Sequence, residues 1–358
     1  MDYKREIRCS LVSSFDPLTR NLRTAVSQRY NNPPKHVNYK LRIDSLSYPQ
    51  HLGHYRVTAS SVLLSITKLL SEATFQVKEK QNSSLIHSFF WSIQRYDLPW
   101  IHENDQSLGQ YFKEYLHSDS WLKRSAVAIA SNTLNSRSCK GIVLWSEWSK
   151  RGYIEDGVEK DKIQVIPPAF VPTPTTPKLH DSLNVLFIGR DYRRKGGDTA
   201  FQVFDSLKKL FSNLRLVYVG RITDPKDLRR VRGDRSIEYH EYVSKNALEQ
   251  NIFPAADLFL LPTRSEAYGM SIVEAMCKGI PIVSSKISAI PEIVEEGVSG
   301  HLCNPQDTTA YADACASILE DEERRKKMGN NALTCISKKF SPDVIGEKLY
   351  SLYSRVTN

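Results

Sequence analysis

The chain has 358 residues, of which 41% are hydrophobic and 25% charged, as expected for a soluble globular protein of two domains. It contains no run of about 18 apolar residues, so the sequence predicts no membrane-spanning helix, and Met1–Glu6 lacks the apolar core of a secretory signal. The six cysteines have no metal-type spacing and predict reduced thiols in a cytoplasmic protein.

The net charge of +9 is distributed unevenly along the chain. Residues 1–180 carry 24 Lys and Arg against 16 Asp and Glu, a balance of +8, whereas residues 181–358 carry 25 against 24, a balance of +1. Scattered lysines can simply keep a protein soluble, but an anionic membrane surface or an acidic acceptor would also suit this charge. Nucleic acid is the weakest option, because we find no zinc-finger or RNA-binding motif and no dense basic block.

Apolar runs and helical patterns alternate in the first half of the chain, which predicts a doubly wound parallel sheet. Helices are expected over Leu18–Tyr30, ended by Asn31–Pro34, and over Val57–Ser71. The predicted strands are Ile7–Ser13, Val37–Ile43, Leu85–Phe90, Pro99–His102, Ala126–Ala130, Ile142–Trp145 and Ile163–Ile166.

The second half repeats this alternation after Pro172–Pro177, a Pro- and Thr-rich stretch typical of a stiff linker. We therefore divide the chain into a first domain at 1–172, a linker at 173–183, a second domain at 184–340 and a closing helix at 341–358 that packs back on the first domain. The strands predicted for the second domain are Val185–Ile188, Leu214–Val219, Ile237–Tyr239, Leu258–Leu261, Ile280–Val283 and His301–Cys303.

The most informative stretch lies between Leu258 and Ser285. Two short apolar strands flank a loop and a helical pattern from Gly269 to Lys278, so the loop opens where a parallel sheet binds ligands. Glu266 lies in the loop and Glu274 in the helix, where carboxylates can accept hydrogen bonds from hydroxyl groups. The helix start at Tyr268, Gly269, Met270 and Ser271 offers backbone N–H groups to a phosphate. This combination suits a nucleotide-sugar, although two solvated glutamates would be the simpler interpretation of the pair alone.

The block Pro262–Gly279 resembles the signature of two glutamates, separated by seven residues, of the retaining GT-B glycosyltransferases, family 4 type. The resemblance continues through Ser284–Ser285, Pro291–Val294 and Gly297–Leu302. It implies a GT-B fold, in which two Rossmann-like domains face a cleft, with an acceptor-side first domain and a second domain that binds the nucleotide-sugar. On the family pattern, Glu266 contacts the donor sugar, Glu274 contacts the ribose, and the base lies near Tyr242, Val243 and Ser244.

A second motif follows the first strand of the second domain, in Gly189–Gly197. Arg190 comes directly after Gly189 at the carboxyl end of that strand, and Lys195 precedes the next helix. Arg and Lys both suit phosphate oxygens, whereas Arg193 and Arg194 are expected to form an ordinary basic surface turn. The stretch resembles the G-R-x(n)-K-G element of the same family, which implies that Arg190 and Lys195 bind the donor diphosphate.

In the first domain, His102 directly follows an apolar strand. A lone histidine is more often structural, but its position resembles that of the family's active-site histidine beside the transferred sugar. His87 is a weaker candidate, and Ser146 and Glu147 are further residues expected at the cleft. Relatives carry a glycine-rich loop after the first strand, where this chain has Ser13–Pro17. This difference from the family pattern affects what the resemblance implies for the acceptor site, not for the donor site.

The resemblance implies a metal-independent hexosyltransferase that uses a UDP- or GDP-linked sugar, retains the anomeric configuration and needs no cofactor. The chain has no D-x-D metal motif, which favours protein cations on the diphosphate, and no G-x-G-x-x-G dinucleotide motif. A saccharide or lipid-linked acceptor and a place in the cytoplasm, peripheral to the inner face of the membrane, are expected. The alternatives are a sugar-nucleotide epimerase, a glycosyl phosphorylase or a non-catalytic module that binds nucleotide-sugars.

Overall fold

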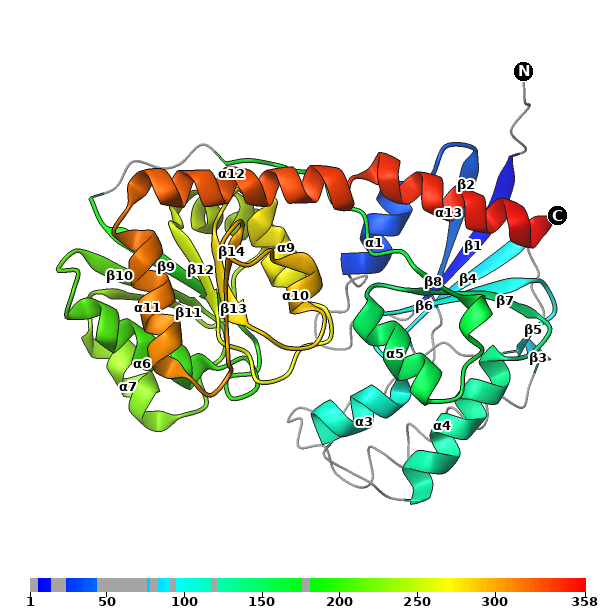
Figure 1. The fold of residues 1–358 in the computed structure, drawn as a ribbon, viewed down its shortest axis with the longest axis horizontal. Helices are drawn as coiled ribbons and strands as arrows, with labels where there is room; N and C mark the ends of the chain where they lie inside the picture. The colour runs from blue at the N-terminus through cyan, green and yellow to red at the C-terminus, as the bar shows by residue number, and fades with distance from the viewer. Residues whose placement is uncertain are drawn as a thin grey trace. The chain divides into compact units, whose positions relative to one another are not determined.

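A computed structural model of the chain describes residues 6–13, 24–43, 76–77, 83–90, 95–116, 121–175 and 181–358. The chain forms two compact units (Figure 1). Unit 1 comprises Met1–Ala169 and Pro342–Asn358, and unit 2 comprises Phe170–Ser341. The start of the predicted linker belongs to unit 2, where the Thr173 N–H donates to the Cys277 carbonyl at 2.9 Å and the Lys278 ammonium donates to the Thr173 hydroxyl at 2.7 Å.

A six-stranded sheet forms the centre of unit 1, and all its paired strands are parallel. The spatial order is β2-β1-β4-β6-β7-β8, and the two-residue strands β3 (Gln76–Val77) and β5 (Arg95–Tyr96) pair separately. Strands β4 and β6 are buried along their whole length, including the polar side chains that they carry. The six strands are β1 (Ile7–Ser13), β2 (Val37–Ile43), β4 (Leu85–Phe89), β6 (Trp100–Asn104), β7 (Cys139–Leu144) and β8 (Ile163–Val165).

The described helices of unit 1 are α1 (Thr24–Asn31), α3 (Leu108–Leu116), α4 (Trp121–Leu134), α5 (Glu147–Glu155) and α13 (Pro342–Thr357). Helix α13 packs on β1, β4 and β7. The strand predicted at Ala126–Ala130 is wrong, because these residues lie within α4 and bury Ala126 and Ala130 at helical spacing. The helix predicted at Val57–Ser71 and the loop from Ser14 to Pro17 lie outside the described residues.

Unit 2 contains a second six-stranded parallel sheet with the order β11-β10-β9-β12-β13-β14. Numbered by sequence within the sheet, the strand order is 3-2-1-4-5-6, the doubly wound order of a Rossmann fold. The switch point of this order lies between β9 and β12. The last two strands begin at Ile282 and Gly300, not at Ile280 and His301 as predicted. The strands are β9 (Leu183–Ile188), β10 (Leu214–Val219), β11 (Ile237–His240), β12 (Leu258–Leu261), β13 (Ile282–Ser285) and β14 (Gly300–Cys303).

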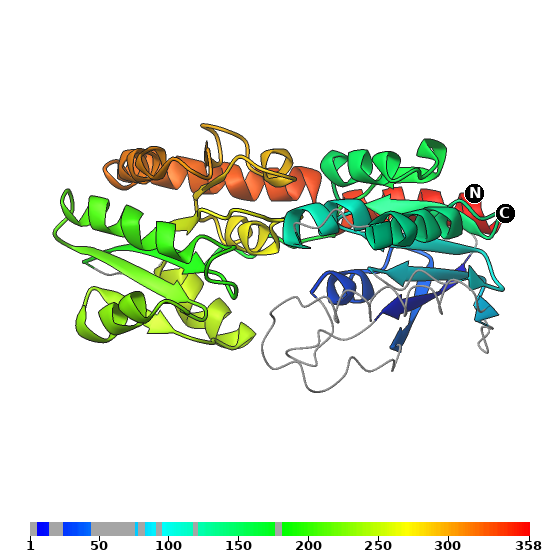
Figure 2. The same cartoon turned by 90° about the horizontal axis from the view of Figure 1, so that it is seen from below.

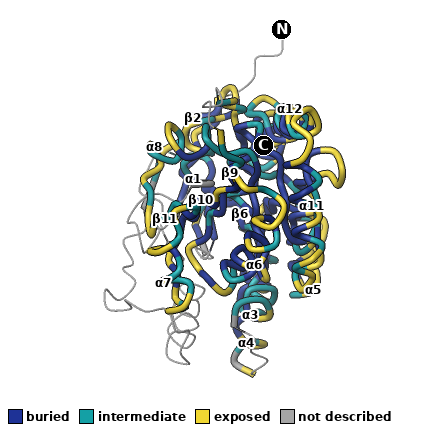
Figure 3. Tube along the Cα trace, turned by 90° about the vertical axis from the view of Figure 1, so that its left-hand side faces the viewer, coloured by how far each residue is buried: buried dark blue, intermediate teal, exposed yellow. Residues whose placement is uncertain are grey.

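Helices cover both faces of the unit 2 sheet (Figure 2). Helices α9 and α11 pack on β12 and β13, α6 packs on β10, and α7 packs on β11. Strands β12 and β13 are buried along their whole length, whereas α7 and α12 carry exposed residues (Figure 3). The helices are α6 (Gly197–Lys208), α7 (Pro225–Gly233), α8 (Lys245–Ala247), α9 (Met270–Met276), α10 (Ile290–Ile293), α11 (Thr308–Leu319) and α12 (Glu322–Lys339).

Two predictions from composition concern the state of the cysteines and the presence of membrane-spanning helices. All six cysteines are buried and have free thiols. Among the described helices, none combines the length and the apolar character that crossing a bilayer requires.

Candidate functional site

The two sequence motifs of unit 2 converge where its strand order reverses. Strand β9 leads into the loop that holds Lys195, and its neighbour β12 leads into the loop that holds Glu266. Because the two strands are parallel and adjacent, both loops leave the same edge of the sheet. Ligands of doubly wound sheets bind in the crevice outside the carboxyl ends of the strands at this point.

A glycine allows the two loops to approach closely. Gly196 has a left-handed backbone conformation with φ of 75°, and a Cβ atom here would overlap the carbonyl oxygen of Pro262. Glycine is the residue that meets both demands without strain. The turn is fixed by hydrogen bonds from the Lys195 N–H to the Asp191 carbonyl at 2.8 Å and from the Gly197 N–H to the Tyr192 carbonyl at 2.8 Å.

Lys195 and Glu266 form an ion pair across the two loops. The Lys195 side chain is 14% exposed and that of Glu266 is 11% exposed, so both are largely buried and keep only a small exposed surface. Burial would raise the pKa of Glu266, but the cations of Lys195 and Arg194 hold it below the usual value. Burial lowers the pKa of Lys195 against the opposing effect of Glu266. The pair offers an amino group and a carboxylate at the same place.

Further contacts fix these loops against each other. The Arg194 carbonyl accepts from the Thr263 hydroxyl at 3.1 Å and from the Arg264 N–H at 2.8 Å, while the Arg194 guanidinium donates to the Ser265 carbonyl at 2.9 Å. The Arg264 guanidinium reaches both carboxylate oxygens of Asp198 at 2.7 and 3.2 Å. We call this set, Arg194, Asp198, Thr263, Arg264 and Ser265, the loop clamp.

The loop clamp corrects one expectation and adds residues that sequence reasoning missed. Arg193 is 63% exposed and pairs with Asp198 and Asp224, as expected of a surface turn, but Arg194 is part of the contact between the loops. Arg264 and Asp198 lie in no recognisable pattern and are 66 residues apart, so local periodicity gives no signal for them.

Helix α9 begins beside this pair. Gly269 caps it with φ of 101°, and both Met270 and Ser271 in its first turn are partly buried. The side chain of Tyr268 is buried at 2% exposure, so a ligand outside the sheet could use only its backbone. Glu274, one turn into the helix, is partly buried, and this burial raises its pKa to about 7 against the opposing effect of Lys245.

The remaining candidates of unit 2 follow the ends of β9 and β11 at the same edge of the sheet. Arg190 is exposed and directly follows the buried Gly189. A Cβ atom at position 189 would crowd the Lys195 side chain and the Phe187 ring. Val243 is partly buried three residues after β11.

His102 lies in the core of unit 1 with no exposed surface. Its ring nitrogens lie 3.3 Å from the Ser88 hydroxyl and 3.2 Å from the Tyr153 hydroxyl. Burial lowers the pKa of His102 to about 3, so the ring is neutral at pH 7. Because both nitrogens have partners and the ring is covered, we assign His102 no direct contact with a sugar.

The neighbouring residue Glu103 forms the centre of a buried network. Its carboxylate accepts from the Arg29 guanidinium at 3.0 Å and from the Trp145 indole at 2.7 Å, and it lies 3.0 Å from His87 Nε2. His87 Nδ1 lies 2.6 Å from the Tyr353 hydroxyl of α13. His87, a weaker candidate for a site residue, therefore ties the closing helix to the sheet.

The two other polar residues suggested for the site of unit 1 occupy ordinary helix positions. Ser146 is buried and caps α5, where its hydroxyl accepts from the Ser149 N–H at 3.0 Å. Glu147 is exposed in the first turn of α5 and pairs with Lys150 at 3.3 Å.

Two Rossmann-like units, with a pair of charged loops at the switch point of the second, are the architecture of the GT-B fold. The family described as glycosyl transferases group 1 matches residues 175–334, which is most of unit 2. This part of the chain is a group 1 glycosyltransferase domain.

Curated relatives are themselves glycosyltransferases. The N-acetyl-alpha-D-glucosaminyl L-malate synthase of Bacillus anthracis is 30% identical over 31% of this chain and 29% of its own length. A D-inositol 3-phosphate glycosyltransferase of Xylanimonas cellulosilytica is 26% identical over 56% of this chain and 53% of its own. The chain thus aligns with about half or less of these relatives.

Solved structures share the fold across the whole chain. A sucrose-phosphate synthase from Thermosynechococcus elongatus has a TM-score of 0.73 at 19% identity and covers 98% of this chain, which in turn covers 99% of it. HepE of Anabaena, solved in complex with UDP and glucose, has a TM-score of 0.68 at 16% identity, with coverage of 98% and 100%.

Proposed function

We propose that this chain transfers a hexosyl unit from a nucleotide-sugar to an acceptor hydroxyl, with retention of the anomeric configuration. The observation that carries the proposal is the ion pair of Lys195 and Glu266 at the switch point between β9 and β12. A cation and a carboxylate at this position suit a donor that combines a diphosphate with a polyhydroxylated ring.

In this proposal the two cations act on the leaving group. Negative charge grows on the diphosphate as the glycosidic bond breaks, and Lys195 and the exposed Arg190 stabilise it where it develops. The backbone N–H groups of Met270 and Ser271, at the positive end of α9, contribute in the same direction. Fixed protein cations support a reaction without a metal ion.

Carboxylates and backbone groups orient the donor. Glu266 accepts hydrogen bonds from the hydroxyls of the transferred sugar, and Glu274 accepts them from the ribose. Val243, after β11, packs against the base. Glu266 is suited to its role because the neighbouring cations keep it ionised.

The reaction needs no enzymatic nucleophile. The acceptor hydroxyl attacks the anomeric carbon on the face that the diphosphate leaves, a C–O bond forms to the acceptor as the bond to the diphosphate breaks, and a diphosphate oxygen takes the hydroxyl proton. The configuration is retained because attack and departure share one face.

Separate observations narrow the chemical identity of the donor and that of the acceptor. Since solved structures of HepE with the same fold contain UDP and UDP-glucose, we favour UDP over GDP. The excess charge of +8 in residues 1–180 supports a lipid-linked acceptor at an anionic membrane face, where positive charge gains from the headgroups. Absence of co-sedimentation with anionic vesicles at low salt would remove the membrane contact.

Nucleotide release tests the proposal. We expect free UDP to appear from UDP-glucose only when a saccharide acceptor is added, with unchanged rates in chelator. An epimerase would convert the donor without acceptor, a phosphorylase would need inorganic phosphate, and a binding module would show nucleotide-dependent stabilisation without turnover. Thermal shift with UDP, GDP and ADP identifies the base in the same series.

A further inference from the structure

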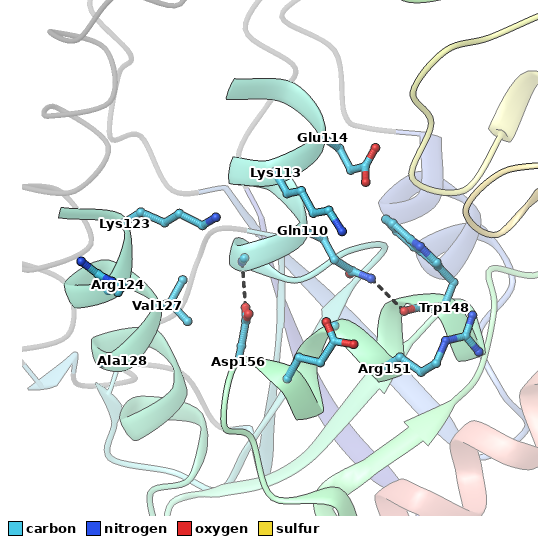
Figure 4. A pocket seen from close by; sticks show the side chains of 13 residues that line it. Gln110, Lys113, Glu114, Lys123, Arg124, Val127, Ala128, Trp148, Arg151 and Asp156 are labelled. Atoms are coloured by element: carbon cyan, nitrogen blue, oxygen red, sulfur yellow. Dashed lines mark hydrogen bonds between the residues drawn. The ribbon is translucent and has the colours of Figure 1, made fainter. Parts of the chain in front are cut away.

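A pocket of about 560 Å³ opens in unit 1 between α3, α4 and α5. Figure 4 shows Gln110 and Lys113 on α3, Lys123 extending from α4 toward α3, and Trp148 and Arg151 on α5 at the other side. Its volume lies within the range of small-molecule sites. The residues that line it belong to unit 1, whereas Lys195 and Glu266 belong to unit 2.

Two glycines shape the floor of this pocket. The Asp156 carboxylate accepts from the Gly109 N–H at 2.7 Å, and a Cβ atom on Gly109 would overlap that carboxylate. Gln110 lies over Gly152, where a Cβ atom would overlap its side chain. The Gln110 amide donates to the Trp148 carbonyl at 2.8 Å, and its oxygen accepts from the Ser107 N–H at 2.9 Å. The floor is therefore polar and held in place by hydrogen bonds.

Two of the cations on the walls, Lys113 and Arg151, lie outside the ion pairs of the described residues. Lys123 and Arg124 add two further cations, against the carboxylates of Glu114, Glu155 and Asp156. Asp156 is engaged with the α3 backbone, so cations outnumber free carboxylates at the opening.

Cations, carboxylates and an indole together define the chemistry of the ligand. Lys and Arg suit phosphate oxygens, Glu114 and Glu155 can accept from hydroxyls, and the partly buried Trp148 offers an apolar ring for a flat carbon face. We propose that this pocket binds a phosphorylated saccharide, with its phosphate on Lys113 and Arg151 and its ring on Trp148.

Calorimetric titration of the full chain tests the site with three probes: glucose 6-phosphate, glucose and inorganic phosphate. Glucose 6-phosphate should bind at least tenfold more tightly than either other probe, because only it uses both the cations and the indole. Added salt should weaken this binding, since the cations lie near the surface. No heat with glucose 6-phosphate, or equal affinity for inorganic phosphate, would overturn the proposal.

Variants locate the binding. Arg151→Gln and Lys113→Gln should each lower the affinity for glucose 6-phosphate about tenfold, equivalent to about 1.4 kcal/mol. Lys150→Gln is the matched control, because Lys150 precedes Arg151 on α5 and pairs with Glu147. Trp148→Leu should weaken binding of glucose 6-phosphate and leave that of inorganic phosphate unchanged. An unchanged melting temperature verifies that each variant is folded.

Lys195→Ala separates this site from the proposed donor site. Binding of glucose 6-phosphate should survive in that variant, while nucleotide binding should survive in Arg151→Gln. Loss of glucose 6-phosphate binding in Lys195→Ala together with normal binding in Arg151→Gln would assign the probe to unit 2 and overturn the pocket proposal. Failure of the transfer assay alone would overturn the proposed function and leave the pocket proposal standing.

Discussion

The guanidinium of Arg264 lies 2.7 Å from a carboxylate oxygen of Asp198 and ties the loop after β12 to the first turn of α6. The same guanidinium donates to the Arg193 carbonyl at 2.6 Å and to the Thr199 hydroxyl at 2.9 Å. Burial would raise the pKa of Asp198, but the hydrogen bonds and charge of Arg264 hold it below the usual value. The Arg264 side chain is thus one of the loop-clamp contacts that fix the spacing between the loops that carry Lys195 and Glu266.

Replacing Arg264 with Lys should lower turnover about tenfold, or about 1.4 kcal/mol, with little change in melting temperature. A Lys ammonium cannot supply the planar fork that spans both oxygens of Asp198. Steady-state kinetics of Arg264→Lys measure the effect, and Arg215→Lys is the control, because Arg215 makes a distant surface pair with Glu238 at 3.6 Å.

A double-mutant cycle distinguishes positioning from general stability. If Arg264 acts by placing Lys195, then Arg264→Lys should cost little further activity in the Lys195→Ala background. Additive losses in the double variant would show that the clamp does not act through Lys195.

Removing the ammonium of Lys195 should lower transfer a hundredfold or more. The expected cost is about 2.7–4 kcal/mol of activation free energy, the scale for losing one donor to a developing negative charge. Turnover of Lys195→Ala checks this, with the exposed Lys208→Ala as control. Near-normal turnover in Lys195→Ala would remove Lys195 from the proposed site.

Ionisation of Glu274 should make stability depend on pH. Its pKa is raised from 4.5 to about 7, so the folded chain binds a proton more tightly than the unfolded chain between these values. The stabilisation is fully present below pH 4.5 and is lost as pH rises through 7, by an amount on the order of 3 kcal/mol.

Denaturant unfolding at a series of pH values measures this effect as the difference between the wild type and Glu274→Gln. Because Gln does not titrate, the wild type should lose stability relative to the variant as pH rises from 4.5 to 7. A constant difference across that range would contradict the raised pKa.

Arg29→Met should destabilise unit 1 by about 3–5 kcal/mol, because it leaves the Glu103 carboxylate buried without its principal counter-charge. Burial would raise the pKa of Glu103, but Arg29 and His87 lower it to about 2, so the carboxylate is charged at any ordinary pH. Chemical denaturation measures the loss.

The exposed pair Glu147–Lys150 provides the comparison for this buried one. Lys150→Met should cost no more than about 1 kcal/mol, as is usual for exposed pairs. Similar losses in Arg29→Met and Lys150→Met would mean that Glu103 does not depend on Arg29.

Most strands of both sheets could be predicted from short apolar runs, and Val37–Ile43 could be predicted from its alternating pattern. Ile7–Ser13, Val37–Ile43 and Leu258–Leu261 were predicted with the observed bounds. The same rule failed at Ala126–Ala130, because a short apolar run within a helix has the same composition, and alanine favours helix.

In the candidate site, too, some contacts could be predicted from the sequence and others could not. The contact of Lys195 with Glu266 follows from two motifs on adjacent strands, so a pattern and a strand order together anticipate it. The Arg264–Asp198 contact depends on how two loops pack, which no local pattern encodes. The burial of His102 depends on Ser88 and Tyr153, which come from different elements, so its strand position alone predicted too open a residue.

The return of the chain to unit 1 at Pro342 sets an order for biosynthesis. Residues 170–341 form a continuous unit that can fold while translation continues. Unit 1 has no such independence, since Tyr353 of α13 supplies the hydroxyl that meets His87 and also contacts the Tyr39 hydroxyl at 2.9 Å. Unit 1 therefore cannot close its core until helix α13, which follows the whole of unit 2 in the sequence, has been synthesised.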